Sequence, residues 1–326
     1  MLYRIFSKNK TFFAVAAAGL LSGCTGGFLG LAPLGDKQEY VRARDLYNHQ
    51  QYQQAVTELT GYIYKAGNVK RREARAYRLL GMSYEQLGRL DKALEVYLEA
   101  LEFHPKNVPL LLAAADLYQR TGLTDPSQEL YDRALKEEPD NLTALAGQAE
   151  NYRSFGFYSK ARAYYDRIFT LDATPSPRYR ARYATTFLNQ GNYEQAFVHI
   201  TQALAQENDN PDYWLISAKA AFGLKNYPQA LLDIRIARKL APQRVDLQLY
   251  QIIGLYQNKR YADSLNEAKD LLAKHPNQPL GLLLLALNEW ALNRKISARA
   301  HLQQAAQQDP ESFVGQVAAR LQSEWK

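Results

Sequence analysis

The chain has 326 residues, with 40 lysine or arginine residues against 33 aspartate or glutamate residues and a formal net charge of +7. Arg4, Lys8 and Lys10 precede the single cysteine, Cys24, so the chain from Cys24 onward has 40 − 3 = 37 basic residues and a net charge of +4. This near balance gives little support to nucleic-acid binding, and a lone cysteine excludes an internal disulfide.

Residues 1–23 have the pattern of a secretory signal, because basic residues precede an apolar run from Phe12 to Leu21. That run is about ten residues long, well short of the ~20 that a membrane-spanning helix requires. The Leu-Ser-Gly-Cys sequence that ends at Cys24 resembles the lipobox of bacterial lipoproteins. The resemblance implies cleavage before Cys24 and attachment of lipid to its thiol. A plain signal peptide with a chance cysteine is the alternative.

Residues 24–35 are predicted to be a lipidated cysteine followed by a short, glycine-containing tether. In the lipoproteins that this motif resembles, the residue after the lipidated cysteine influences sorting. Here that residue is Thr25 and not aspartate, which favours the inner leaflet of an outer membrane, facing the periplasm. We therefore expect a lipid-anchored protein of a bacterial cell envelope.

From residue 74 onward, one pattern of large, small and aromatic residues recurs with a period of 34 residues. Its first full copy contains Tyr77, Leu80, Gly81 and Tyr84 on one helical face, then Ala93, Tyr97 and Ala100 on a second, then Pro105. This pattern resembles the tetratricopeptide repeat, a helix–turn–helix unit that stacks on its neighbours. The resemblance predicts an all-α fold, a right-handed superhelical solenoid of about eight units with a C-terminal capping helix.

Eight predicted units and one terminal helix account for the chain after the tether. The units are expected at about 36–69, 74–107, 108–141, 142–175, 177–210, 211–244, 245–278 and 279–312. Segment 313–326 is expected to form the capping helix, with Phe313, Val317, Leu321 and Trp325 on its apolar face. The last unit departs from the pattern, since Glu289 occupies a site that is usually aromatic.

The sequence contains no arrangement of residues that is typical of a catalytic or metal site. The five histidines are spread over five predicted units, and none has metal-ligand spacing. The glycines follow the repeat period and do not form a phosphate-binding loop, and no nucleophile elbow is present. We therefore predict a protein that is not an enzyme and that binds no cofactor or metal.

In the repeat family that this chain resembles, exposed positions of the first helix in each unit line an inner groove. The matching residues form a polar end with arginines, Arg75, Arg78 and Arg120, and an apolar end, Leu215, Phe222, Leu249, Ile253, Tyr256, Leu283, Leu287 and Trp290. These residues are the predicted partner-binding surface. The alternative for the apolar end is burial by closure of the superhelix or by the C-terminal helix.

A basic cluster, Lys70-Arg71-Arg72 with Arg75 and Arg78, also has alternatives. It could contact anionic lipid headgroups, hold a peptide carboxylate, or simply be a solvated face.

The predicted function is that of a membrane-anchored scaffold or assembly factor that binds a protein or peptide of the cell envelope. The overall build resembles repeat-containing lipoproteins that help to assemble outer-membrane machines, such as the pilotins of type IV pilus secretins and the scaffolds of peptidoglycan hydrolases. A glycan- or peptidoglycan-associated role in cell-wall remodelling or polysaccharide export is the alternative. The oligomeric state stays open.

Overall fold

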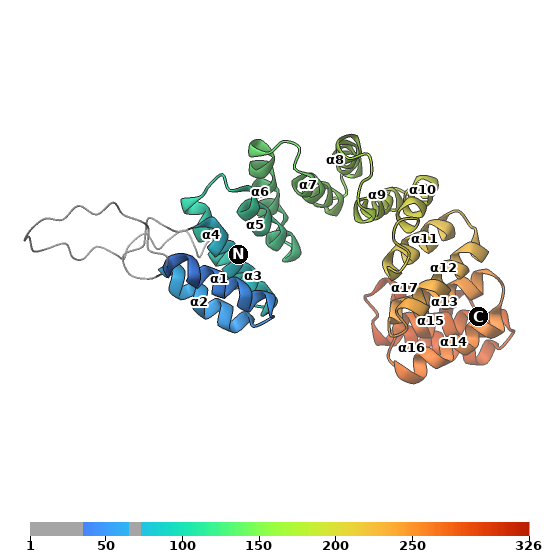
Figure 1. The fold of residues 1–326 in the computed structure, drawn as a ribbon. Coiled ribbons are helices and arrows are strands. Elements are labelled where there is room, and N and C mark those ends of the chain that lie inside the picture. The colour runs from blue at the N-terminus through green and yellow to red at the C-terminus, as the bar shows by residue number, and fades with distance from the viewer. Residues whose placement is uncertain (1–34, 65–72, 326) are drawn as a thin grey trace, which may run out of the picture.

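The structure, a computed structural model, describes residues 35–64 and 73–325, and within these ranges it contains seventeen helices and no strand (Figure 1). The helices are α1 (Gly35–Asn48), α2 (Tyr52–Tyr64), α3 (Ala74–Gln86), α4 (Leu90–Phe103), α5 (Val108–Arg120), α6 (Thr124–Glu137), α7 (Leu142–Ser154), α8 (Tyr158–Leu171), α9 (Pro177–Asn189), α10 (Tyr193–Leu204), α11 (Pro211–Gly223), α12 (Tyr227–Leu240), α13 (Val245–Gln257), α14 (Tyr261–Lys274), α15 (Pro279–Ala291), α16 (Lys295–Gln308) and α17 (Phe313–Glu324). None of the described helices is long and apolar enough to cross a membrane.

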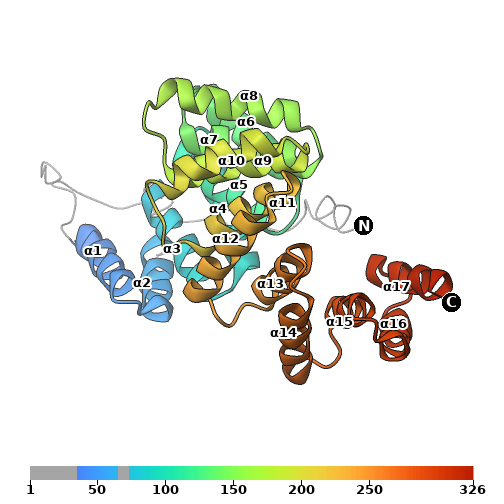
Figure 2. The same ribbon diagram turned by 90° about the vertical axis from the view of Figure 1, so that its right-hand side faces the viewer.

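Sixteen of these helices form eight consecutive pairs, and each pair packs on the next to build an arch (Figure 1). Odd-numbered helices also contact one another across neighbouring units, as α3 does with α5 and α13 with α15, which places the first helix of each pair on the inside of the curve. The turned view in Figure 2 shows that successive pairs also rotate about the axis of the stack. The predicted all-α solenoid of helix pairs is confirmed.

Each pair turns sharply between its two helices, and the turn residue explains part of the repeat pattern. In four of the turns a glycine has a positive φ, between 71° and 78°, which a residue with a side chain adopts at a cost. Later turns place Lys225, Lys259 and Asn293 in the same region, with φ between 57° and 62°. The first helices often start at a capping side chain, as Asn141 accepts a hydrogen bond from the amide of Ala144.

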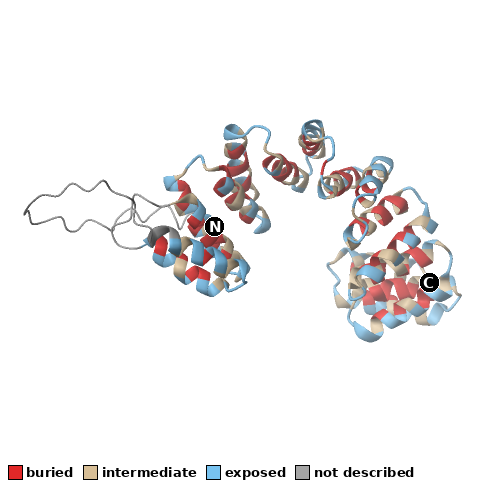
Figure 3. Cartoon of the chain, in the orientation of Figure 1, coloured by how far each residue is buried: buried red, intermediate tan, exposed pale blue. Residues whose placement is uncertain are grey.

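Small residues inside the pairs make room for large rings. A Cβ atom at Gly81 would lie 2.1 Å from the ring of Tyr97, and one at Gly147 would lie 2.2 Å from the ring of Tyr131. These contacts are too close for any side chain, so each tyrosine of a second helix packs directly against glycine backbone. In Figure 3 the buried residues, in red, lie on the sides of the helices that face one another.

The stack is not uniform along its length. One cluster of buried side chains runs without a break from Ala43 in α1 to Ala144 in α7, whereas later units have several smaller clusters. Between α8 and α9, where a longer loop of residues 172–176 connects two units, consecutive helices touch least. The middle of the arch is therefore its most loosely packed junction.

Helix α17 packs on the last pair, α15 and α16, in the way that the first helix of a further unit would. Val314, Val317 and Leu321 lie against the cluster formed by α15 and α16, and Trp325 stacks on Trp290 with ring centroids 4.1 Å apart and an interplanar angle of 14°. The predicted apolar face was wrong at Phe313, which is 80% exposed. Phe313 is the first residue of the helix, so it extends beyond the neighbour on which the rest of the helix packs.

Candidate functional site

Carboxylate–arginine pairs lie along the inner face of the first half of the arch. Glu85 of α3 forms an ion pair with Arg120 of α5, and Asp116 lies 3.5 Å from the same guanidinium group. The hydroxyl of Tyr97 donates to the Glu85 carboxylate at 2.7 Å. Burial, together with the nearby Glu85 carboxylate, raises the pKa of Tyr97, so its hydroxyl stays protonated as a donor.

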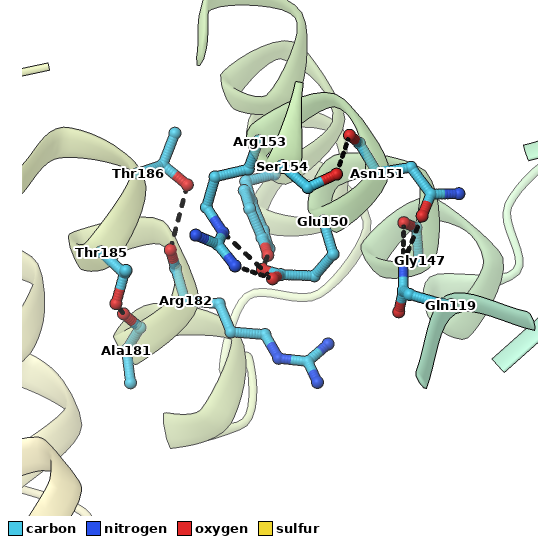
Figure 4. Close-up of polar contacts among 11 residues, drawn as sticks. Gln119, Gly147, Glu150, Asn151, Arg153, Ser154, Ala181, Arg182, Thr185 and Thr186 are labelled. Carbon is cyan, nitrogen blue, oxygen red and sulfur yellow. Dashed lines mark hydrogen bonds and ion pairs between the residues drawn. The ribbon is translucent and has the colours of Figure 1, made fainter. Parts of the chain in front are cut away.

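A second pair of the same kind lies further along, within α7 (Figure 4). Arg153 donates to one oxygen of Glu150 through Nε at 3.0 Å and through Nη2 at 2.7 Å. Tyr165 of α8 donates to the other oxygen at 2.6 Å, and burial raises the pKa of its hydroxyl. Glu150 is thus neutralised and held in place by its own unit.

Amide side chains link the first helices of neighbouring units. The side-chain amide of Gln119 on α5 donates to the carbonyl oxygen of Gly147 at 3.0 Å and to the side-chain oxygen of Asn151 at 2.6 Å (Figure 4). Asn151 is buried and donates in turn to the hydroxyl of Ser127 at 3.2 Å. These bonds hold α5 and α7 in a fixed relation, so the charged residues beside them are presented by a rigid surface.

Next to this surface, α9 carries two arginines that have no ion-pair or hydrogen-bond partner for their side chains within residues 35–64 and 73–325. Arg178 is exposed and Arg182 is half-buried. In the view of Figure 4 the guanidinium group of Arg182 lies below Glu150, and no contact is drawn to it. Its backbone carbonyl accepts a hydrogen bond from the hydroxyl of Thr186 at 3.0 Å.

Neither Arg178 nor Arg182 is among the residues predicted from the sequence, although Arg182 departs from the repeat pattern. The residues at its register in the other seven units are all apolar, namely Val41, Leu79, Ala113, Gly147, Ile216, Tyr250 and Leu284. A charge at a position that is otherwise apolar breaks the repeat pattern, and such departures are common at functional sites.

The predicted arginines lie on the inner face, in three different states. Arg75 contacts Glu73 and lies over the ring of Tyr40, with its guanidinium carbon 4.7 Å from the ring centroid. Arg120 is held by Glu85. Arg78 is exposed and has no side-chain partner among the described residues.

The predicted apolar end is largely used for packing, which is the alternative of burial that the sequence left open. Leu215, Leu249 and Leu283 are only 6%, 8% and 7% exposed. The remaining residues of that set are half-buried: Phe222, Ile253, Tyr256, Leu287 and Trp290. Phe222 lies near Tyr250 and Gly254 of the next unit, Tyr256 packs on Tyr261, and Trp290 is covered by Trp325. The first helices converge on the inside of the curve, so large apolar side chains there cover one another.

Several predicted features fall outside the described residues. The signal segment 1–23, the lipidation site Cys24, the tether up to residue 34 and the basic triplet 70–72 all belong to this group. Within the described ranges, no group of three or more His, Cys, Asp or Glu side chains is arranged to hold a metal ion.

Solved structures of similar proteins share this architecture. A tetratricopeptide repeat protein from Parabacteroides merdae ATCC 43184 is 20% identical, with a TM-score of 0.63 over 78% of this chain and 99% of that one. The Cut9–Hcn1 hetero-tetramer of APC/C gives a TM-score of 0.63 at 15% identity, over 88% of this chain and 55% of that one. PilW, a widely conserved type IV pilus biogenesis factor, is 18% identical, with a TM-score of 0.53 over 78% of this chain and all of that one. At these identities the likeness concerns the fold alone.

No curated protein sequence matches the chain significantly. Family models for the tetratricopeptide repeat match residues 40–108, 84–147, 182–245 and 251–313, which together cover well over half of the chain. Each match begins within the first helix of a pair. The chain therefore belongs to the tetratricopeptide repeat family.

Proposed function

We propose that this protein is a lipid-anchored scaffold of a bacterial cell envelope, which binds a segment of a partner protein along the inner face of its solenoid. The repeat family supports the general part of this proposal, since its fold supplies an extended concave surface for protein–protein interaction. The observation that carries it is the polar inner face from α3 to α9. There, neutralised carboxylates and linked amides form a rigid surface around accessible arginines.

The anchor is supported by the sequence of residues 1–24, with its basic start, short apolar run and cysteine. A role in assembling an envelope machine is supported by the shared fold of PilW, a type IV pilus biogenesis factor. We place the protein in the outer membrane, facing the periplasm, because Thr25 follows the cysteine. The aromatic side chains that a glycan-binding alternative would use at the C-terminal end are already half-buried by packing.

Site-specific crosslinking in intact cells tests the binding surface. A photoreactive residue in place of Arg78, on the inner face, should give crosslinks to a distinct partner. The same residue in place of Arg299, exposed on α16 as a second-helix position, is the control and should not. Equal crosslinking from both positions, or none from the inner face, would contradict the proposal.

The anchor has its own test. Replacing Cys24 with serine should abolish labelling of the protein by radioactive palmitate and release it from the membrane fraction. Equal labelling of the variant and the wild type would show that Cys24 is not the lipidation site.

A further inference from the structure

We propose that the turns of the last three helix pairs form a surface that lies against anionic lipid headgroups. We call it the basic turn surface, and it consists of Lys225, Lys259, Arg260, Arg294, Lys295 and Ile296. This proposal rests on the proposed function, because the lipid anchor would hold the protein at a membrane. It adds a second contact with that membrane, on an edge of the solenoid and not on its inner face.

The three turns, residues 224–226, 258–260 and 292–294, lie next to one another along this edge. Figure 1 shows the pairs α11–α12, α13–α14 and α15–α16 stacked in succession, and α12 packs on α13 as α14 does on α15. The side-chain amide of Asn258, in the second turn, donates to the backbone carbonyl of Tyr227, directly after the first turn, at 2.9 Å. Leu292, in the third turn, packs against the apolar cluster of α13, α14 and α15. The turns therefore form one continuous surface.

Two of the lysines occupy a strained backbone position. Four earlier turns have a glycine in the left-handed region of φ, which a residue with a side chain adopts at a cost. At the same position of the later turns, Lys225 and Lys259 have φ of 58° and 57°. Both side chains are exposed, so packing does not explain why lysine replaces glycine. Strain of this kind is typical of functional positions, and what these side chains supply is charge.

The cations of the basic turn surface are mostly without a counter-charge. Lys225, Lys259 and Arg294 are exposed, and their side chains have no ion-pair or hydrogen-bond partner among residues 35–64 and 73–325. Arg260 differs, since its guanidinium group lies 2.5 Å from the carboxylate of Asp263. The turns themselves contain no aspartate or glutamate. This edge therefore presents positive charge that the described chain does not neutralise.

The opposite edge of the solenoid has the opposite charge. It consists of the loops that join one pair to the next, and in the middle of the arch these loops are acidic, at 138–141, 172–176 and 205–210. An anionic membrane would attract the turns and repel these loops. The charge distribution thus favours one orientation, with the turns toward the lipid.

An exposed aliphatic side chain lies among the cations. Ile296 is 89% exposed, and it comes directly after Arg294 and Lys295. A membrane interface accepts both kinds of group, because an apolar side chain enters the boundary of the acyl chains while lysine and arginine attract the headgroup phosphates. A second copy of the chain is a poorer match, since its acidic loops contain no large apolar residue to pack on Ile296. We therefore favour a lipid surface over self-association.

The chain between the proposed anchor and the solenoid is long enough for this orientation. Helix α1 starts at the edge opposite to the turns, and its 14 residues correspond to a length of about 21 Å. The ten residues from Thr25 to Leu34 can reach roughly 33 Å when extended. Their length alone allows the solenoid to rest on its turns while Cys24 stays at the membrane.

Full-length lipidated protein on vesicles tests this contact. In Gln257→Cys, an environment-sensitive fluorophore is attached at the exposed end of α13, beside the second turn. The thiol of Cys24 carries lipid in the proposed anchor, so only the new cysteine reacts. Gln243→Cys, labelled in the exposed loop of the opposite edge, is the matched control.

Two vesicle compositions read the charge dependence. On vesicles with equal parts of phosphatidylcholine and phosphatidylglycerol, acrylamide quenching of the label at Gln257 should be at least about twofold weaker than on pure phosphatidylcholine. The label at Gln243 should be quenched equally on both. The protection at Gln257 should decrease as salt rises, because salt screens exposed charges.

Variants separate the basic turn surface from general charge. Lys225→Gly with Lys259→Gly should lower the ratio of docked to undocked protein on the mixed vesicles about tenfold or more at low salt. This variant should melt at the wild-type temperature or above it, because glycine relieves the strain at positive φ. Lys239→Ala with Lys269→Ala removes the same charge from exposed positions of α12 and α14, and it should change the ratio less than about twofold.

Each of three results would overturn the proposal. The labels at Gln257 and Gln243 could respond equally, the two lysine pairs could lose docking equally, or pure phosphatidylcholine could protect the label at Gln257 as well as the mixed vesicles do. Self-association without vesicles, measured by light scattering and abolished by Lys225→Gly with Lys259→Gly, would assign the surface to a second copy of the chain.

Flotation with pure phosphatidylcholine vesicles reads the anchor separately. Wild-type protein that fails to float with them would contradict the lipid anchor of the proposed function. Protein that floats with both kinds of vesicle, but shows no protection of the label at Gln257 on the mixed ones, would contradict the basic turn surface alone.

Discussion

The middle of the arch and its C-terminal end carry side chains of different size at the same position of the repeat. At one inner position, the middle units carry alanine, Ala146 and Ala181, and the C-terminal units carry leucine, Leu249 and Leu283. All four side chains are buried. The alanines are small, so neighbouring charged and amide side chains stay accessible to solvent. The leucines fill that space. We therefore expect the inner face to bind a partner only where its packing residues are small.

The two regions also differ in how successive units are joined. Hydrogen bonds between amide side chains link α5 to α7, whereas α15 joins its neighbours through the consecutive buried side chains of Leu282, Leu283, Leu284 and Leu285. The C-terminal end further covers its inner aromatic residue, Trp290, with Trp325 of the last helix. We expect the C-terminal units to carry most of the local stability and the middle units most of the recognition.

The largest expected effect is the loss of apolar packing in α15. Leu285 is 4% exposed and belongs to the cluster shared by α13, α14 and α15. Leu285→Ala should lower the free energy of local unfolding by about 2–5 kcal/mol, since it removes buried methyl groups and leaves a cavity. Hydrogen exchange of α13–α17 measures this change. Leu232→Ala is the control, because Leu232 is 52% exposed and its truncation should change exchange little.

A smaller effect is expected at the one buried carboxylate that replaces an aromatic residue of the repeat. Glu289 is 4% exposed, and His301 lies 2.7 Å from its Oε2 atom. His301→Leu would leave Glu289 buried without this partner, which should cost about 2 kcal/mol of local stability.

The double variant Glu289→Tyr with His301→Leu tests that explanation. Tyrosine is the residue at this register in three other units, Tyr84, Tyr118 and Tyr152, so it should recover much of the lost stability. A double variant that is no more stable than His301→Leu alone would show that the carboxylate is not the cause.

These contrasts explain which features the sequence could predict. The helix pairs, their period and the terminal cap follow from local spacing, since the residues at each register must bury the same faces in every unit. Exposure on the inner face depends instead on how tightly neighbouring first helices converge, which no single repeat encodes. The sequence therefore identified Leu215 and Leu249 as inner-face residues but could not show that they are covered. Arg182 could have been found by comparing one register across all units.

The contact between the last helix and α15 should be weaker than either of the preceding interactions. Trp325→Ala removes the ring that stacks on Trp290, and such aromatic pairs contribute about 1 kcal/mol beyond their burial. Faster hydrogen exchange confined to α17 and α15, together with a change in tryptophan fluorescence, would show this loss. Tyr256→Ala with Trp290→Ala should also lower stability, and it should reduce partner binding less than replacing the inner-face arginines Arg78 and Arg182 with glutamine. The reverse ranking would restore the C-terminal inner face as the binding surface.

The smallest expected effect concerns a buried carboxylate that has only neutral partners. Asp233 of α12 is fully buried and accepts hydrogen bonds from Ser217 at 2.7 Å and from Gln229 at 2.8 Å. Burial raises the pKa of Asp233, and the two hydrogen bonds only partly oppose that rise. The folded protein therefore binds this proton more tightly than the unfolded chain does. Its contribution to stability is present at low pH and is lost as the pH rises through the folded pKa.

Asp233→Asn removes that pH dependence. The variant should be slightly more stable than the wild type at neutral pH, and its advantage should shrink as the pH falls through the raised pKa of Asp233. Parallel denaturation of both proteins across this acidic range measures the difference. Asp246 offers a comparison of opposite sign, because its hydrogen bonds from Arg244 lower its pKa, so Asp246→Asn should be less stable than the wild type at neutral pH. If Asp233→Asn is instead less stable by the same amount at every pH, the two hydrogen bonds of the charged group outweigh its burial.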